Sequence, residues 1–79
     1  MEQGLRTVAD PIRRRPRLTH RHVRLLQLLA DDRTLRQAAR ELGVSESYVY
    51  NAMQAIKAEL EVDTVTGAVA YAMREKLLA

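Results

Sequence analysis

The chain lacks cysteine, phenylalanine and tryptophan, and it has only three glycines and two prolines among its 79 residues. Without cysteine, disulfide bonds and thiolate metal sites are excluded. No apolar run approaches the roughly 20 residues of a membrane-spanning helix, and the N-terminus lacks the apolar stretch of a secretory signal. We therefore expect a cytoplasmic protein without a membrane segment, whose core is aliphatic and helical.

A chain of this length has room for one small domain and not for a large catalytic cleft. His20 and His22 are two positions apart near the start of a predicted helix, where their side chains diverge, and no third ligand follows at metal spacing. The glycines are too scattered for a phosphate-binding loop, and no nucleophile has a visible base beside it. We expect a protein that is not an enzyme and has no catalytic residue, metal or cofactor.

Positive charge is concentrated in the first half of the chain. Residues 1–45 carry ten arginines against five acidic residues, whereas residues 46–79 carry three bases against five acids. This asymmetry suits contact with nucleic acid, although a solvated basic tail is also common. We predict a flexible arm over residues 1–17 and a folded domain over residues 18–79. The arm has a basic run that fits either a minor groove or phosphates in general: Arg13, Arg14, Arg15 and Arg17.

Apolar residues recur at helical spacing in four segments, which predicts helices over 19–30, 34–42, 46–60 and 64–78. Thr34 and Gln37 form a capping-box pair, and Ser45 caps the third helix. The predicted core faces, helix by helix, are Val23, Leu26, Leu29 and Ala30 with Leu25 alongside; Leu35, Ala38, Ala39 and Leu42; Val49, Ala52, Met53, Ile56 and Leu60; and Val65, Ala68, Val69, Ala72, Met73 and Leu77.

The second and third predicted helices are joined by a short, glycine-containing turn. Ala39 leaves room where two helix backbones approach, Gly43 supplies the backbone freedom of a sharp turn, and Val44 and Val49 fill the angle between the helices. This spacing is typical of a helix-turn-helix, whose second helix fits a DNA groove. It predicts a compact all-α domain that binds double-stranded DNA.

The third predicted helix has a polar face opposite its apolar stripe. Asn51 and Gln54 lie on this face, and an amide side chain bonds the adenine edge bidentately, so these two are the best candidates for base contacts. Tyr50 lies beside them and is free to enter a groove. We predict that further residues contact phosphates through their hydroxyl groups or positive charges. These are Arg36, Ser45, Ser47, Tyr48 and Lys57, together with the arginines of the arm and with Arg33 and Arg40.

Several short motifs match one family pattern: Leu18-Thr19, then Ser45-Glu46-Ser47-Tyr48-Val49, then Ala68-Val69 and Leu77-Leu78. In these motifs the chain from Leu18 to Leu78 resembles the LuxR/GerE family of four-helix bacterial transcription regulators. The resemblance implies DNA binding by the third helix, with contacts from the positions of Tyr50, Asn51 and Gln54. It also implies pairing of two protomers through the fourth helix.

The fourth predicted helix has more apolar surface than one face can bury, which favours packing against a second copy. We predict a dimer interface formed by Val65, Val69, Tyr71 and Met73. A chain of 79 residues leaves no room for a receiver or ligand-sensing domain, so we expect regulation through abundance, a partner or co-assembly.

The chain departs from the family pattern at several positions. His22 replaces a glutamate, which removes the carboxylate from a capping box begun by Thr19 and is expected to weaken the first helix. Lys57 is the only base of the third helix, so the electrostatic part of DNA binding is weakened. The family has Lys, His, Lys and Gly at four further positions, which here are Tyr50, Ala52, Glu59 and Glu61.

Two other interpretations stay open. The domain could be a protein-binding adaptor that docks on RNA polymerase or another regulator through Tyr48, Tyr50 and Tyr71, because tyrosines are favoured at protein interfaces. Region 4 of an RNA polymerase sigma factor is also similar at Thr34-Leu35 and Leu42-Gly43-Val44-Ser45. The well-filled fourth helix counts against that second alternative.

Overall fold

A computed structural model of the chain describes residues 16–78. These residues form four α-helices, named α2 (His20–Ala30), α3 (Leu35–Leu42), α4 (Glu46–Leu60) and α5 (Val65–Arg74). The described range contains no strand, so the predicted all-α, four-helix class is confirmed. Most of the predicted arm lies outside the described residues, which include only its last two positions.

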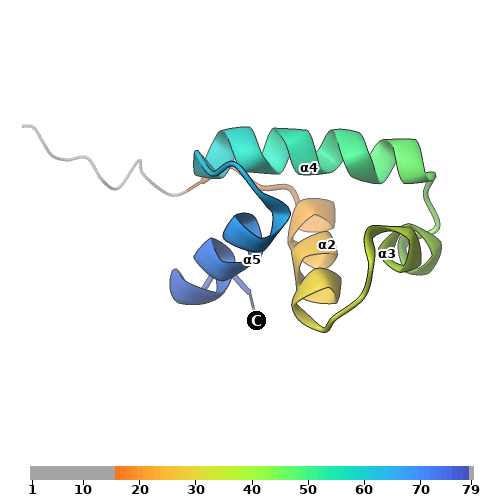
Figure 1. Ribbon diagram of the computed structural model, residues 1–79, viewed down its shortest axis with the longest axis horizontal. Helices are drawn as coiled ribbons and strands as arrows, with labels where there is room; N and C mark the ends of the chain where they lie inside the picture. Colours follow the sequence, from red (N-terminus) through yellow and green to blue (C-terminus); the bar gives the residue numbers. More distant parts are fainter. Residues whose placement is uncertain (1–15, 79) are drawn as a thin grey trace, which may run out of the picture.

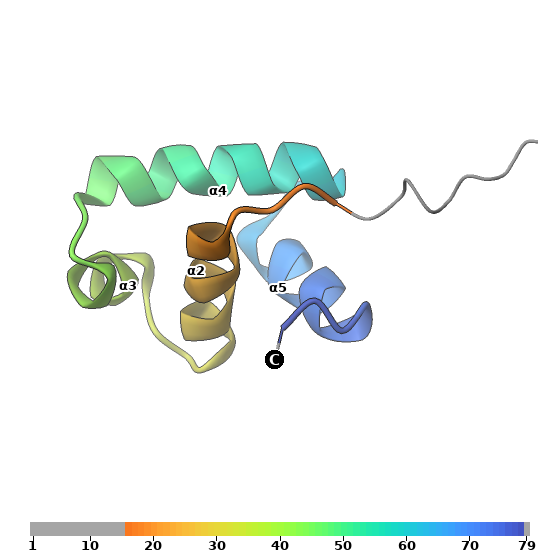
Figure 2. The same cartoon turned by 180° about the vertical axis from the view of Figure 1, so that it is seen from behind.

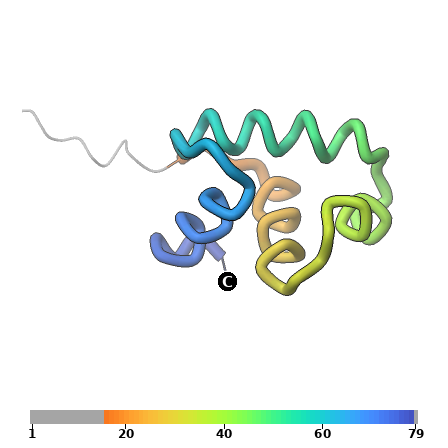
Figure 3. The backbone as a smooth tube through the Cα atoms, in the orientation of Figure 1, coloured from red at the N-terminus to blue at the C-terminus, as the bar shows by residue number. Residues whose placement is uncertain are grey.

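The long helix α4 lies across one side of the domain, and the other three helices pack beneath it (Figures 1 and 2). α3 lies under the N-terminal end of α4, α2 under its middle and α5 toward its C-terminal end (Figure 3). α2 contacts α3, α4 and α5 and lies between α3 and α5 beneath α4 (Figure 1). This arrangement leaves the upper face of α4 uncovered by any other described helix.

The core confirms the predicted stripe of α4 in full and corrects that of α2. Val49, Met53 and Ile56 are at most 2% exposed. In α2 the buried residues are Leu25, Leu26 and Leu28, whereas the predicted Val23, Leu29 and Ala30 are only half buried. The prediction gave α2 a single inward face, but a helix with neighbours on three sides buries more of its circumference.

The helix starts are capped by side chains. Thr34 and Gln37 form the predicted capping box, with Oγ1 and Oε1 each accepting a backbone N–H. Ser45 Oγ accepts the N–H of Tyr48 at 3.0 Å, as predicted. The expected loss of the capping box of α2 is wrong. His22 completes it, since its Nδ1 accepts the N–H of Thr19 at 3.4 Å and thereby replaces the carboxylate.

Each described helix ends in the same type of turn. At α3, Gly43 has φ +71° and the N–H of Val44 donates to the carbonyl of Ala39 at 3.0 Å, which is a Schellman motif. The same pair of backbone bonds closes α2, α4 and α5, although the left-handed position there is not glycine. Those positions and their φ angles are Asp32 (66°), Glu61 (57°) and Lys76 (57°).

The predicted end of the last helix is wrong. α5 ends at Arg74, and the Leu77 N–H donates to the carbonyl of Ala72 at 2.8 Å, so the chain turns back there. Leu77 and Leu78 are half buried and pack against the core. Because this turn lets two leucines cover the core, burial of their side chains favours ending the helix over continuing it.

Candidate nucleic-acid interface

The uncovered face of α4 is mostly polar, with the exposed Ala55 and Ala58 toward its C-terminal end. Tyr50, Asn51 and Gln54 are all exposed, with Tyr50 at 55% of its surface, while Val49 and Met53 are buried on the opposite side. Ser47 is exposed one turn before them. The structure therefore brings the three predicted base-contacting residues together on one surface of one helix.

This face has a fixed direction because α3 and α4 pack closely. Ala38 and Ala39 of α3 are at most 3% exposed, and small side chains there allow the two helix backbones to approach. Gly43 sets the angle of the turn, since its φ of +71° is strained for residues with a Cβ. The αL turn at Gly43, the Ser45 cap and the packing of Val44 on the core then determine where α4 begins.

Two of the predicted phosphate contacts lie at the N-terminal end of α4. Arg36 Nε lies 3.1 Å from Glu46 Oε2, with the two side chains 74% and 51% exposed. Such an exposed pair is weak, so Arg36 can exchange this carboxylate for a phosphate. The Ser45 Oγ that accepts the Tyr48 N–H keeps its own hydroxyl proton as a donor.

Arg33 has a structural partner. Its Nε lies 2.6 Å from Glu41 Oε2 and its Nη1 donates to the carbonyl of Asp31 at 3.3 Å. The hydrogen bond to Glu41 and the charge of that carboxylate raise the pKa of Arg33. Arg33 thus links the turn after α2 to α3. Within residues 16–78, Arg40 forms no ion pair and is exposed.

Tyr48 is held more firmly than an ordinary surface residue. Its side chain is half buried against the core, and the guanidinium carbon of Arg21 lies 5.6 Å from the centroid of its ring. This cation–π contact brings a positive charge from α2 to the first turn of α4. No sequence pattern indicates this role for Arg21, because the contact joins residues far apart in the chain. Lys57, another predicted phosphate contact of α4, is half buried.

The end of the basic arm meets the opposite end of α4. The backbone N–H of Arg17 donates to Glu59 Oε2 at 2.8 Å. Arg17 therefore lies beside the last turn of the helix. In Figure 2 the orange segment before α2 passes this end of α4. The other arginines predicted to contact phosphate in the arm lie outside the described residues: Arg13, Arg14 and Arg15.

A groove between α2 and α5 contains most of the predicted dimer interface. Val65, Val69 and Met73 line it together with Leu29 of α2, and Met73 is 58% exposed. Tyr71 is not part of this lining, since its ring is half buried against the core with Arg74 5.7 Å from its centroid.

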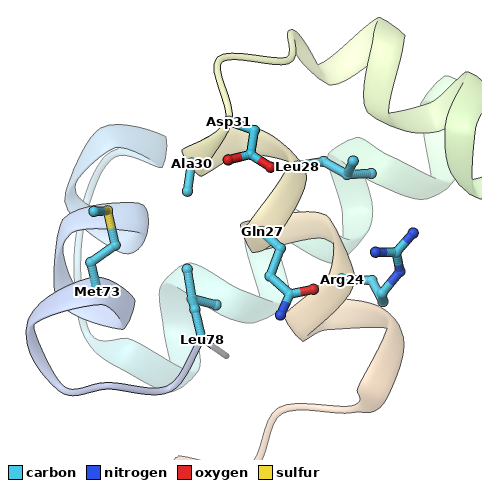
Figure 4. Close-up of a pocket in the computed structure, with 7 residues that line it drawn as sticks. All are labelled: Arg24, Gln27, Leu28, Ala30, Asp31, Met73 and Leu78. Carbon is cyan, nitrogen blue, oxygen red and sulfur yellow. The ribbon is translucent and has the colours of Figure 1, made fainter.

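A second groove adjoins the first on the other side of Met73. Met73 and Leu78 lie on one side of it, and Arg24, Gln27 and Asp31 on the other (Figure 4). The apolar surface of Met73 thus separates two hollows, each of which has α2 as its opposite wall.

Two other features are missing from the described part of the chain. Residues 16–78 contain no group of three histidine, cysteine or acidic side chains placed to hold a metal ion. No helix in the same range has the length and apolar character needed to cross a bilayer.

The arrangement of these helices can be compared with known proteins. No family model matches the chain, and no curated protein does. Among solved structures, the response regulator ChrA of a heme-sensing two-component system is 33% identical to this chain and superposes with a TM-score of 0.76. The match covers 81% of this chain. The domain is of the helix-turn-helix type. This chain spans 32% of the length of ChrA.

In this helix-turn-helix, α3 is the first helix and α4 the second. The second helix is the one that enters a DNA groove in such domains. Here it is 15 residues long, and its outward face has its acidic side chains near the two ends, at Glu46 and Glu59. The central part of that face carries no charge.

Proposed function

We propose that this protein regulates transcription by binding duplex DNA with α4 in the major groove. The observation that supports this most strongly is the uncovered face of α4, where Tyr50, Asn51 and Gln54 stand together on the second helix of the motif. Asn51 and Gln54 read base edges through their amides, since asparagine and glutamine bond the N6 and N7 atoms of adenine. The similarity to a response regulator supports the same class of function. We also propose that the chain belongs to the LuxR/GerE family, whose motifs it resembles.

The electrostatic part of binding comes from residues around α4. Arg21 and Arg36 flank its N-terminal end, and Arg17 lies at its C-terminal end. Each acidic residue of the outward face is engaged, Glu46 by Arg36 and Glu59 by the Arg17 N–H. Positive side chains that surround a neutral reading surface position a domain on phosphates while its polar face reads bases.

We further propose that two copies pair through α5, as the family resemblance implies. Val65, Val69 and Met73 provide an apolar patch beside a groove, and such patches mark protein interfaces. Two-fold pairing through one such patch presents two α4 helices to two half-sites of an operator. Tyr71 lies outside this patch because its ring packs against the core, so the proposed interface consists of Val65, Val69 and Met73.

The adaptor interpretation is the second candidate, with RNA polymerase or another regulator as its partner. It needs exposed tyrosines, but Tyr48 and Tyr71 are half buried and each lies under an arginine. Only Tyr50 is exposed among the described tyrosines, so the DNA-binding interpretation explains more of the surface.

The proposal is tested by selecting a preferred duplex from a random pool and measuring its affinity against a shuffled duplex. Asn51→Ala combined with Gln54→Ala is expected to abolish the preference for the selected duplex while leaving salt-dependent binding to both. Gln27→Ala, which removes an amide from α2 away from α4, is the matched control and is expected to keep the preference. A wild-type protein that binds neither duplex at low salt would contradict DNA binding and favour the adaptor.

A further inference from the structure

Residues 16–19, which include the last two residues of the arm, are attached to the domain at successive positions. Pro16 is half buried, and Leu18 packs against the core. The Arg17 N–H between them donates to Glu59 Oε2 at 2.8 Å, across 42 positions of sequence. Thr19 then caps α2 through its Oγ1. Residues 16–19 therefore cross the C-terminal end of α4 along a fixed path (Figures 1 and 2).

Glu59 is an unfavourable residue for a DNA-binding helix if only its charge is considered. It is exposed on the last turn of α4, where a carboxylate repels phosphates. Its hydrogen bond to a backbone N–H gives the residue a second effect. It fixes the position of Arg17, whose side chain is exposed at the same end of the helix.

Arg17 is the last arginine of the predicted basic run, and it lies within the described residues. Its guanidinium is always charged and binds phosphate oxygens well. Fixing its backbone therefore limits which phosphates beside α4 this charge can reach.

We propose that Glu59 is a positioning residue for DNA binding: by accepting the Arg17 N–H at the end of α4, it directs the guanidinium of Arg17 to a phosphate of the duplex that flanks the bases read by α4. This inference rests on the proposed function. It assigns a favourable effect to a carboxylate whose charge alone would weaken binding.

Two substitutions separate the hydrogen bond from the charge. Glu59→Gln removes the negative charge but keeps an oxygen that accepts the Arg17 N–H. Glu59→Ala removes both. Glu61, which is exposed two positions further on, gives the matched controls Glu61→Gln and Glu61→Ala. Both substituted positions are on the surface, and thermal unfolding verifies that each variant is folded.

The first readout uses the free protein and does not depend on DNA. Trypsin cleaves after arginine, and the attached segment protects the bond between Arg17 and Leu18. We expect Glu59→Ala to be cleaved there faster than the wild type, and Glu59→Gln and both Glu61 variants to be cleaved at the wild-type rate. Equal cleavage of Glu59→Ala and Glu59→Gln would overturn the anchoring.

The second readout is the dependence of affinity for a duplex on salt concentration. Glu59→Gln is expected to bind as tightly as the wild type or more tightly. Glu59→Ala is expected to bind more weakly than Glu59→Gln, and its slope of log K against log salt should be smaller by about 0.9 if Arg17 no longer neutralises one phosphate. The two Glu61 variants should not differ from each other.

The outcomes distinguish this inference from the proposed function. If Glu59→Ala binds DNA as tightly as Glu59→Gln, Glu59 acts only through its charge and the inference is wrong, while DNA binding stands. If no variant and no wild-type protein binds DNA, the proposed function is wrong, and the role of Glu59 in DNA binding is overturned with it.

Discussion

At the scale of single residues, the exposed pair between Arg36 and Glu46 limits how strongly α4 attracts DNA. The two side chains are 3.1 Å apart at the N-terminal end of the helix, and both are largely exposed. An exposed pair of this kind is worth at most about 1 kcal/mol, so a phosphate competes with Glu46 for the arginine. The carboxylate also repels the DNA backbone.

Removal of that carboxylate is expected to strengthen binding. Glu46→Gln frees Arg36 and removes one negative charge, so the affinity for any duplex should rise and its salt dependence should steepen by about 0.9 in slope if Arg36 then binds one phosphate. Fluorescence anisotropy at several salt concentrations measures both quantities. Glu75→Gln removes an equal charge at the end of α5 and should change neither.

His22 is a second residue whose role is local. Its Nδ1 accepts the Thr19 N–H at 3.4 Å, which is at the long end of the hydrogen-bond range. A carboxylate accepts more strongly and also interacts favourably with the N-terminal end of a helix. His22→Glu should therefore raise the free energy of unfolding by about 0.5–1 kcal/mol, measured by urea denaturation. His22→Ala, which has no acceptor, should lower it.

At the scale of the helices, substitutions at the left-handed positions of the helix ends are expected to change stability in opposite directions. Replacing glycine there should destabilise the protein, and introducing glycine should stabilise it. Gly43 has φ +71°, and a Cβ built there meets nothing within 4 Å, so Gly43→Ala costs only backbone strain. We expect it to lower the free energy of unfolding by about 1–2 kcal/mol. Urea denaturation of the folded variant measures this change.

The reverse substitution is expected to stabilise α4. Glu61 has φ +57°, which is strained for a residue with a Cβ. Glu61→Gly relieves this strain, but glycine also gains freedom in the unfolded chain, so the net gain is about 0.5–1 kcal/mol. Asp63→Gly, at a nearby exposed position without positive φ, should not stabilise the protein. If Glu61→Gly lowers stability as Gly43→Ala does, the assigned turn geometry is wrong.

These helix ends also show which parts of the fold the sequence predicts. The starts of α3 and α4 follow from local signals, because Thr34, Gln37 and Ser45 bond to groups within three residues of themselves. The ends of α2, α3 and α4 fall where they are predicted, but sequence reasoning predicts a left-handed residue only at Gly43, because it relies on glycine to mark that conformation. An apolar residue just after the helix end, such as Val62 or Leu77, is the signal that locates two of the others.

The sequence does not predict which residues of distant segments contact each other. The burial of Leu28 depends on α2 being surrounded by three helices. The positions of Arg21 over Tyr48 and of Arg17 beside Glu59 depend on the path of the whole chain. The residues of the candidate reading face were predictable, since Asn51 and Gln54 follow from helical spacing alone. The contacts that place Arg21 and Arg17 around this face were not predictable.

At the scale of the whole molecule, the apolar groove beside α5 bears on the proposed dimer. Met73 is 58% exposed and lies among Val65, Val69 and Leu29. A charge at this position would be buried without a partner in a dimer but solvated in a monomer. A charged substitution of Met73 should therefore weaken the dimer without lowering the stability of the monomer.

Met73→Glu is expected to weaken dimerisation at least about tenfold, which corresponds to about 1.4 kcal/mol. Sedimentation velocity over a range of protein concentrations measures it. Met73→Leu keeps the apolar surface and should retain the dimer. Thermal unfolding at low concentration should be similar for both variants. A dimer that persists unchanged in Met73→Glu would show that the protomers pair elsewhere.

The central claim is that the outward face of α4 contacts DNA. The most direct measurement is the change in backbone amide NMR signals of the ¹⁵N-labelled protein on titration with a duplex at low salt. The account predicts the largest changes at Ser47, Tyr50, Asn51 and Gln54, with smaller ones at Arg17 and Arg36 and little change along the groove beside α5. Changes concentrated at Val65, Val69 and Met73, or none at all in the folded protein, would contradict it.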